Sequence, residues 1–117
     1  MKEDIFKAST PEEGVRRKEA YVKIMVKEWL DSGKARINPD GSYDVDGDVD
    51  LSNMNLDKIP VKFNLVGGYF YCSNNNLTSL EGCPKEVGGD FYCSYNKKQF
   101  TEEEVRSVCN VKGDIYV

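Results

Sequence analysis

The side chains best suited to chemistry in this sequence are tyrosines and aspartates that alternate with apolar residues in four short segments. The segments begin at Gly47, Gly68, Gly89 and Gly113 and read GDVD, GYFY, GDFY and GDIY. Successive side chains of a β-strand point to opposite faces, so the second and fourth residues of each segment share one face. We expect the outward face to hold Tyr69, Tyr71, Tyr92, Tyr116, Asp48, Asp50, Asp90 and Asp114.

These eight residues predict an aromatic and acidic surface that binds a protein partner. Tyrosine offers a large contact area with a polar tip, and it is enriched at protein interfaces. Aspartates beside the rings favour a partner surface rich in lysine and arginine, through cation–π and ionic contacts. The alternative is that stacked tyrosines serve only to stabilise the sheet by contacts along one face. The sequence leaves both interpretations open.

Catalysis is disfavoured by what the sequence lacks. The chain has no histidine, which is the usual general base and the commonest metal ligand. Cys83 or Cys109 could act as a nucleophile only with an activating base. The glycine pairs at 67–68 and 88–89 fit the repeat and do not form a phosphate-binding loop with a lysine. We therefore predict that the protein is not an enzyme and needs no cofactor.

The run from Asp44 to Asp50 has a carboxylate at every second position, which raises a calcium-binding alternative. An EF-hand loop needs glycine at its sixth position and glutamate at its twelfth. Counted from Asp44, those positions hold Val49 and Asn55, so the template fails. A strand with outward carboxylates and inward valines explains the same alternation. We predict no metal site, and keep a calcium or small-ligand module as a second alternative function.

The four cysteines, at positions 72, 83, 93 and 109, contain no C-x-x-C pair, so a zinc site is disfavoured. Cys72 and Cys93 occupy the same position in successive segments and alternate with tyrosines. We expect them to be small buried thiols stacked in one core column. Strands about 4.8 Å apart would allow a disulfide between them, which a reducing compartment disfavours.

Charge and hydropathy restrict which classes of partner the protein could bind and in which cellular compartment it is expected. The chain has 117 residues, a net charge of −4 and a pI near 4.9, which argues against binding to a nucleic-acid backbone. It has no run of 18 apolar residues that could span a membrane. The start, MKEDIFKAST, is charged and lacks the apolar centre of a signal peptide. We expect a cytoplasmic protein with no membrane partner.

The spacing of the glycine-led segments indicates the fold that positions the candidate face. The steps from 47 to 68, 68 to 89 and 89 to 113 are 21, 21 and 24 residues. A period near 21 is typical of a solenoid, in which each coil stacks on the previous one. We predict an α+β repeat protein, a short β-solenoid of about three coils. Its core columns are expected to be Val49, Phe70, Phe91 and Ile115, and then Leu51, Cys72, Cys93 and Val117.

The region before the repeats predicts a helix and a hairpin. Apolar residues three and four apart indicate an amphipathic helix over about 11–31, with a capping box at Thr10–Glu13. This helix would cap the open end of the solenoid, or alternatively serve in a dimer or bind a partner. Residues 35–46 read as a hairpin. The domain assignment is a capping-helix region at 1–34 and a solenoid at 35–117, together forming one compact domain.

The last repeat departs from the others. A second capping box at Thr101 predicts a short helix over about 102–109, with Val105, Val108 and Cys109 on one buried face. A final edge strand is expected at Asp114–Val117. Between strands, Asn75 and Asn96 align at one turn position, where we expect each amide to bond the backbone of its own and a neighbouring coil.

The segments at 70–84 (FYCSNNNLTSLEGCP) and 87–94 (VGGDFYCS) resemble leucine-rich-repeat-like proteins, in particular the short Cys-Ser-x-Asn type found in bacteriophages and prophages. The resemblance covers about 43–117. Met54 departs from it by replacing the turn asparagine of the first coil, and Lys97–Phe100 departs by replacing the leucines of the third. The resemblance implies short parallel strands with irregular or 3₁₀ returns.

The resemblance also implies a function. It suggests a phage-encoded modulator or inhibitor of a bacterial host protein, such as a defence or metabolic enzyme, acting in the host cytoplasm as a monomer or weak homo-oligomer. An alternative is a structural or assembly accessory protein that self-associates. The host setting is an expectation from the family, and self-association would use the exposed helix or the sheet edges.

Overall fold

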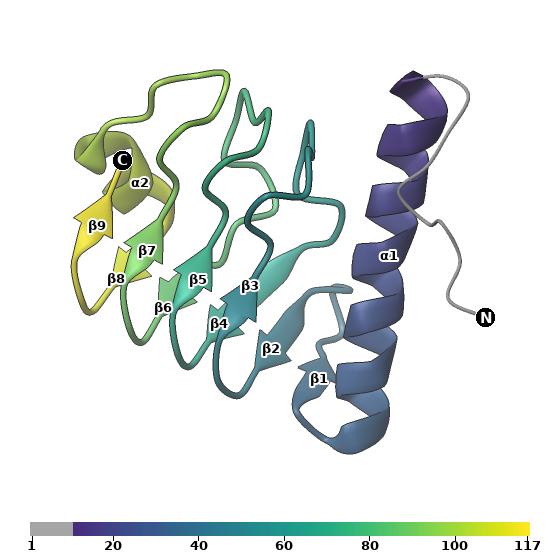
Figure 1. The fold of residues 1–117 in the computed structure, drawn as a ribbon. Coiled ribbons are helices and arrows are strands. Elements are labelled where there is room, and N and C mark those ends of the chain that lie inside the picture. Colours follow the sequence, from purple (N-terminus) through teal and green to yellow (C-terminus); the bar gives the residue numbers. More distant parts are fainter. Residues whose placement is uncertain (1–10) are drawn as a thin grey trace.

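Two stacks of short, mostly parallel strands form a β-solenoid of about four turns (Figure 1). The structure is a computed structural model that describes residues 11–117, with side chains described from residue 18 onward. Sheet A contains β1 (Ala35–Ile37), β2 (Tyr43–Val45), β4 (Phe63–Val66), β6 (Glu86–Val87) and β8 (Asn110–Val111). Sheet B contains β3 (Val49–Asp50), β5 (Phe70–Tyr71), β7 (Phe91–Tyr92) and β9 (Ile115–Tyr116). Each turn contributes one strand to each sheet.

The solenoid prediction is confirmed, and the number and anatomy of the turns differ from it. About four turns are present instead of three, because the 24-residue last step also completes a turn through β8 and β9. Each return carries a second strand where irregular or 3₁₀ structure was expected. Two-residue strands such as β6 are too short to show alternation in the sequence, so only the hairpin strands of sheet A, β1 and β2, were predicted.

The register of sheet B matches the expected inner column. Val49 pairs with Phe70, Phe70 with Phe91, and Phe91 with Ile115. The two phenylalanines are fully buried, and their rings lie 5.3 Å apart between centroids. Leu51, Cys72 and Cys93 form the second buried column. Val117 was expected to continue that column and is exposed, because β9 lies at the edge of sheet B.

Helix α1 (Pro11–Ser32) confirms the predicted helix and packs at the N-terminal side of the solenoid, beside β1 (Figure 1). Val22 is fully buried and belongs to the same core cluster as the strand residues, with Trp29 packed against that cluster. The helix ends at Ser32, and Gly33 follows it with a φ of 85°, which suits glycine. The proposed cap Thr10 lies outside the described residues. No helix in the described part of the chain is long and apolar enough to cross a membrane.

The hairpin at 35–46 is confirmed as β1 pairing antiparallel with β2. Helix α2 (Glu102–Val108) also forms as predicted, at the C-terminal side of the solenoid (Figure 1). Its capping box is present, since the Thr101 hydroxyl oxygen accepts the Glu104 N–H at 3.1 Å and the Glu104 carboxylate accepts the Thr101 N–H at 2.9 Å. These reciprocal bonds fix where the helix begins.

The predicted burial of Val108 is wrong, because its side chain is 48% exposed. Val105 alone anchors the helix in the core, with no measurable exposure. Cys109 is buried only because the chain leaves the helix there in an extended conformation, with φ −141° and ψ 133°. A seven-residue helix therefore has one anchoring residue, where helical spacing suggested three.

The turn asparagines make the predicted backbone bonds. Asn75 accepts the N–H groups of Met54 and Leu56, both at 3.0 Å, and donates to the carbonyls of Leu51 at 2.9 Å and Cys72 at 3.1 Å. One buried amide thus satisfies backbone groups of two consecutive turns. Asn96 repeats this arrangement one turn later with a half-buried side chain.

Candidate functional site

The outward face of sheet B brings all eight predicted residues together in four consecutive turns. We call this surface the tyrosine–aspartate face; it comprises Asp48, Asp50, Tyr69, Tyr71, Asp90, Tyr92, Asp114 and Tyr116. Tyr69 and Tyr116 are 41% and 44% exposed, and Tyr71 and Tyr92 are half-buried. The alternation inferred from the sequence therefore separates a phenylalanine interior from a tyrosine exterior.

Three of the tyrosine rings form a continuous stack along the face. Tyr71 and Tyr92 have ring centroids 4.7 Å apart and planes inclined by 16°. Tyr92 and Tyr116 have the same separation and an inclination of 8°. The spacing matches the distance between neighbouring strands, so the pairing of β5, β7 and β9 sets the stack.

The aspartates that precede the strands lean toward the following turn. The Asp48 carboxylate accepts the Tyr69 N–H at 2.8 Å, and Asp90 accepts the Asp114 N–H at 2.8 Å. A Cβ atom on Gly68 would lie only 2.1 Å from the Asp48 oxygen. The glycine is therefore required by a side chain of the preceding turn, and it also lets the two backbones approach closely.

Tyr69 takes the equivalent position in the second turn and leans in the same direction. A Cβ on Gly89 would lie 2.0 Å from a Tyr69 ring carbon, and the Tyr69 ring lies 6.3 Å from that of Tyr92. Sequence reasoning explained the glycine pairs only as part of the repeat and missed this role. The sequence does carry a signal for it, because Gly68 follows Asp48, and Gly89 follows Tyr69, by about one repeat period.

Three carboxylates of the face, those of Asp48, Asp50 and Asp90, accept hydrogen bonds from other groups of the protein. Asp50 accepts the Ser52 N–H at 3.0 Å and also its hydroxyl, while Asp90 accepts the Tyr92 hydroxyl at 3.3 Å. Loss of hydration raises the pKa values of Tyr71 and Tyr92, and nearby carboxylates add to the effect. The Tyr71 and Tyr92 hydroxyls therefore stay protonated at neutral pH, and that of Tyr92 already donates to Asp90.

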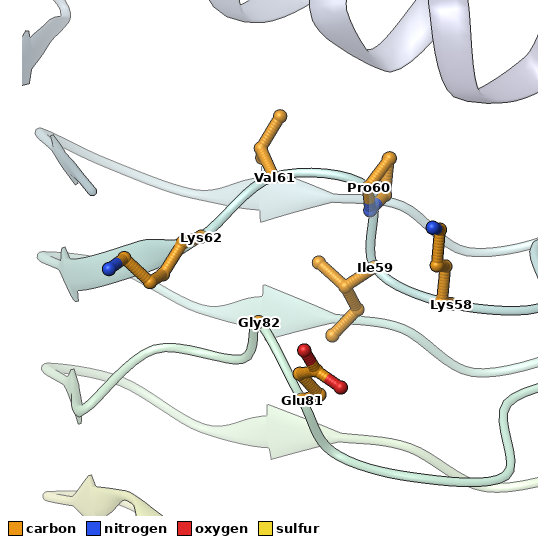
Figure 2. Close-up of a pocket in the computed structure, with 7 residues that line it drawn as sticks. All are labelled: Lys58, Ile59, Pro60, Val61, Lys62, Glu81 and Gly82. Carbon is orange, nitrogen blue, oxygen red and sulfur yellow. The ribbon is translucent and has the colours of Figure 1, made fainter. Parts of the chain in front are cut away.

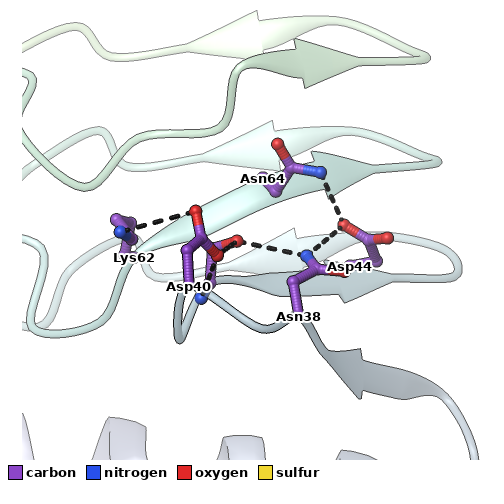
Figure 3. Close-up of polar contacts among 6 residues, drawn as sticks. Asn38, Asp40, Asp44, Lys62 and Asn64 are labelled. Carbon is purple, nitrogen blue, oxygen red and sulfur yellow. Dashed lines mark hydrogen bonds and ion pairs between the residues drawn. The ribbon is translucent and has the colours of Figure 1, made fainter.

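The acidic run from Asp44 to Asp50 is divided between the two sheets. Asp44 lies on β2 of sheet A, where it accepts the side-chain amides of Asn38 at 3.0 Å and Asn64 at 2.9 Å (Figure 3). Asp46 pairs with Arg36 at 3.0 Å. Within the described residues, no group of three or more His, Cys, Asp or Glu side chains is arranged to hold a metal ion.

All four cysteines are buried and unbridged, as predicted for Cys72 and Cys93. Burial raises the pKa of Cys83 to about 12 and that of Cys109 to about 11. The pKa of Cys72 is also raised, mainly by a hydrogen bond with Cys93 and secondly by burial. Thiols in this state are poor nucleophiles at neutral pH.

A hollow of about 260 Å³ lies in the return loops, away from the predicted residues, and is lined by residues 58–62, Glu81 and Gly82. Figure 2 shows Lys62 extending away from Lys58 and Glu81, so these charged groups do not converge on one point. Its floor is apolar, formed by Ile59 and its neighbours, and the sequence carried no signal for it. The tyrosine–aspartate face thus remains the candidate site.

No protein-family model, curated protein or solved structure matches this chain.

Proposed function

We propose that this protein is a non-catalytic protein-binding module whose tyrosine–aspartate face contacts a partner with a basic surface. The observation that carries this proposal is the stack of Tyr71, Tyr92 and Tyr116 on an accessible face of the solenoid. Rings needed only for stability could be covered by other parts of the fold, as those of Phe70 and Phe91 are.

The face is ordered before any partner binds. Ring stacking, strand pairing and the bonds from Asp48 and Asp90 hold it in one geometry. Binding therefore requires little additional loss of side-chain entropy, which favours affinity. Tyrosine also loses few rotamers on contact and keeps a hydroxyl for polar recognition.

Charge indicates the nature of the partner. The eight residues of the face include four aspartates and no lysine or arginine, and the whole chain has a net charge of −4. Such a surface attracts lysine and arginine side chains, and it repels nucleic-acid phosphates. We therefore propose that the tyrosine–aspartate face binds a basic surface of a partner protein.

The resemblance supplies the biological setting of the proposal. We infer a leucine-rich-repeat-like solenoid of the short Cys-Ser-x-Asn type, encoded by a phage, that modulates or inhibits a host protein in the bacterial cytoplasm. The repeated Cys-Ser segments at 72–73 and 93–94 and the turn asparagines Asn75 and Asn96 support it.

The test is quantitative capture from bacterial lysate with three forms of the protein. We expect the wild type to enrich a partner that the Tyr71→Ala/Tyr92→Ala variant loses, because both central rings of the stack are removed. Tyr95→Asn is the matched control: Tyr95 is 79% exposed, lies outside the stack and has a φ of 59°, which asparagine tolerates. Equal capture by the wild type and the double variant, both folded by circular dichroism, would exclude this face as the site.

The edge strand β9 favours one second candidate, self-association in an assembly role. It is the last strand of sheet B in the described residues, and it carries the exposed Tyr116 and is followed by the exposed Val117. Edge strands readily pair with another chain. Sedimentation at micromolar concentration distinguishes the candidates, since a monomer at all concentrations contradicts self-association.

A further inference from the structure

We propose that the partner presents an arginine side chain, which stacks on the Tyr71 ring from the side of the first turn and pairs with Asp48 and Asp50. This inference rests on the proposed function and names the chemical group that the same face recognises. It places the contact at one end of the tyrosine stack, at a site that we call the arginine slot, formed by Asp48, Asp50 and Tyr71.

The slot exists because the first turn lacks a tyrosine. Strand register places Asp50, Tyr71, Tyr92 and Tyr116 in one row, one per turn. Tyr92 has a stacked ring on each side, whereas Tyr71 has a stacked ring only on the side of Tyr92. On its other side the row continues with a carboxylate. The ring face of Tyr71 toward the first turn is therefore not covered by an aromatic ring of the row.

Tyr69 does not fill this position, although it adjoins Tyr71 in sequence. Its ring meets the Tyr71 ring edge-on, with planes inclined by 68° and centroids 6.0 Å apart. It leans toward the third turn, because its ring carbons occupy the space above Gly89 and lie close to Tyr92. The side of Tyr71 toward the first turn is thus left to the two aspartates.

Both aspartates are held in place through one oxygen. Oδ1 of Asp50 accepts the N–H and hydroxyl of Ser52, and Oδ1 of Asp48 accepts the N–H of Tyr69. Oδ2 of each carboxylate takes no part in these bonds. Two fixed carboxylates therefore lie beside an aromatic face, and neither needs to give up an existing bond to receive a donor.

Arginine fits this combination better than lysine. A guanidinium is planar and weakly hydrated, so it can stack on a ring while its five N–H groups reach carboxylates in its plane. A lysine ammonium is a compact, strongly hydrated charge without a stacking surface. At the other end of the stack, Tyr116 lies on edge strand β9. Within the described residues, sheet B therefore has no further strand to place a carboxylate against the outer face of the Tyr116 ring.

The test is an NMR titration of the full chain with the probe peptide acetyl-Gly-Arg-Gly-amide. Its control is the same peptide with citrulline, which keeps the shape and loses the charge. We expect shifts of the Tyr71 ring and of the Asp48 and Asp50 amides with the arginine peptide only. Asp50→Asn removes one exposed ion pair and should weaken binding about two- to fivefold, whereas Asp114→Asn should change it little.

A second variant tests the missing ring directly. Asp50→Tyr adds a tyrosine ring at the first-turn position of the row, where it should stack on Tyr71 and abolish the shifts. Circular dichroism checks that the variant is folded. Absence of shifts, equal shifts with citrulline, or shifts centred on Tyr116 would overturn the arginine slot. Those results would leave the lysate capture and its loss in the Tyr71→Ala/Tyr92→Ala variant unaffected, so the proposed function and this inference fail separately.

Discussion

Replacing Asn75 by alanine should destabilise the protein more than any other single polar truncation on the turns. The side chain is 7% exposed and satisfies backbone groups in two turns. Three of its partners lie in buried surroundings: the Leu56 N–H and the carbonyls of Leu51 and Cys72. At roughly 1–1.5 kcal/mol for each bond lost, the variant should lose about 3–5 kcal/mol of unfolding free energy.

Urea unfolding measures this loss, with the single tryptophan, Trp29, and far-ultraviolet circular dichroism as probes. The equivalent Asn96→Ala variant should lose less, because its bonds are only partly buried. Asn110→Ala is the control: its side chain is exposed, so a change within about 0.5 kcal/mol is expected. If Asn75→Ala costs no more than Asn110→Ala, buried amides do not hold the turns together.

Gly88→Ala should destabilise the fold by about 1–3 kcal/mol or more in thermal melts, since its Cβ would lie 2.3 Å from the Gly67 carbonyl oxygen. Gly67→Ala is the control and should be tolerated, because the atom nearest to its Cβ would lie 3.5 Å away. The raised pKa of Cys83, about 12, means that the folded state holds this proton more tightly than the unfolded state, whose thiol pKa is about 8.5. That stabilisation is present in full below about pH 8.5 and is lost as the pH rises toward about 12. The urea midpoint of the wild type should therefore fall across this pH range, and the midpoint of Cys83→Ala should fall less steeply. Thr101→Ala should cost about 1 kcal/mol by removing the cap of α2, and a change near zero in urea unfolding would show that this helix end is held by other contacts.

Sequence reasoning located the inner columns and the outer face because both depend on strict alternation. A residue such as Phe70 cannot change faces without moving Tyr71 inward, so the apolar pattern alone decides the register. The turn asparagines were also predictable, since a polar residue repeating at a buried corner must bond the backbone.

The features that were missed depend on contacts between turns. Beyond the predicted hairpin strands β1 and β2, the strands of sheet A have two to four residues, so Val66, Val87 and Val111 show too little alternation to be identified as strand positions. The lean of Tyr69 over Gly89 is a contact across a full period, which no local pattern encodes. Val108 was misplaced because helical spacing indicates a common face and does not indicate how much of that face meets the core.

Site-specific photo-crosslinking tests the central claim most directly. A benzoylphenylalanine replaces Tyr116 on the tyrosine–aspartate face, or Ile37 on the exposed part of β1 in sheet A. After irradiation in bacterial lysate, we expect a protein adduct from position 116 that an excess of wild-type protein suppresses, and no such adduct from position 37. A suppressible adduct from position 37 alone would contradict the assignment of binding to sheet B.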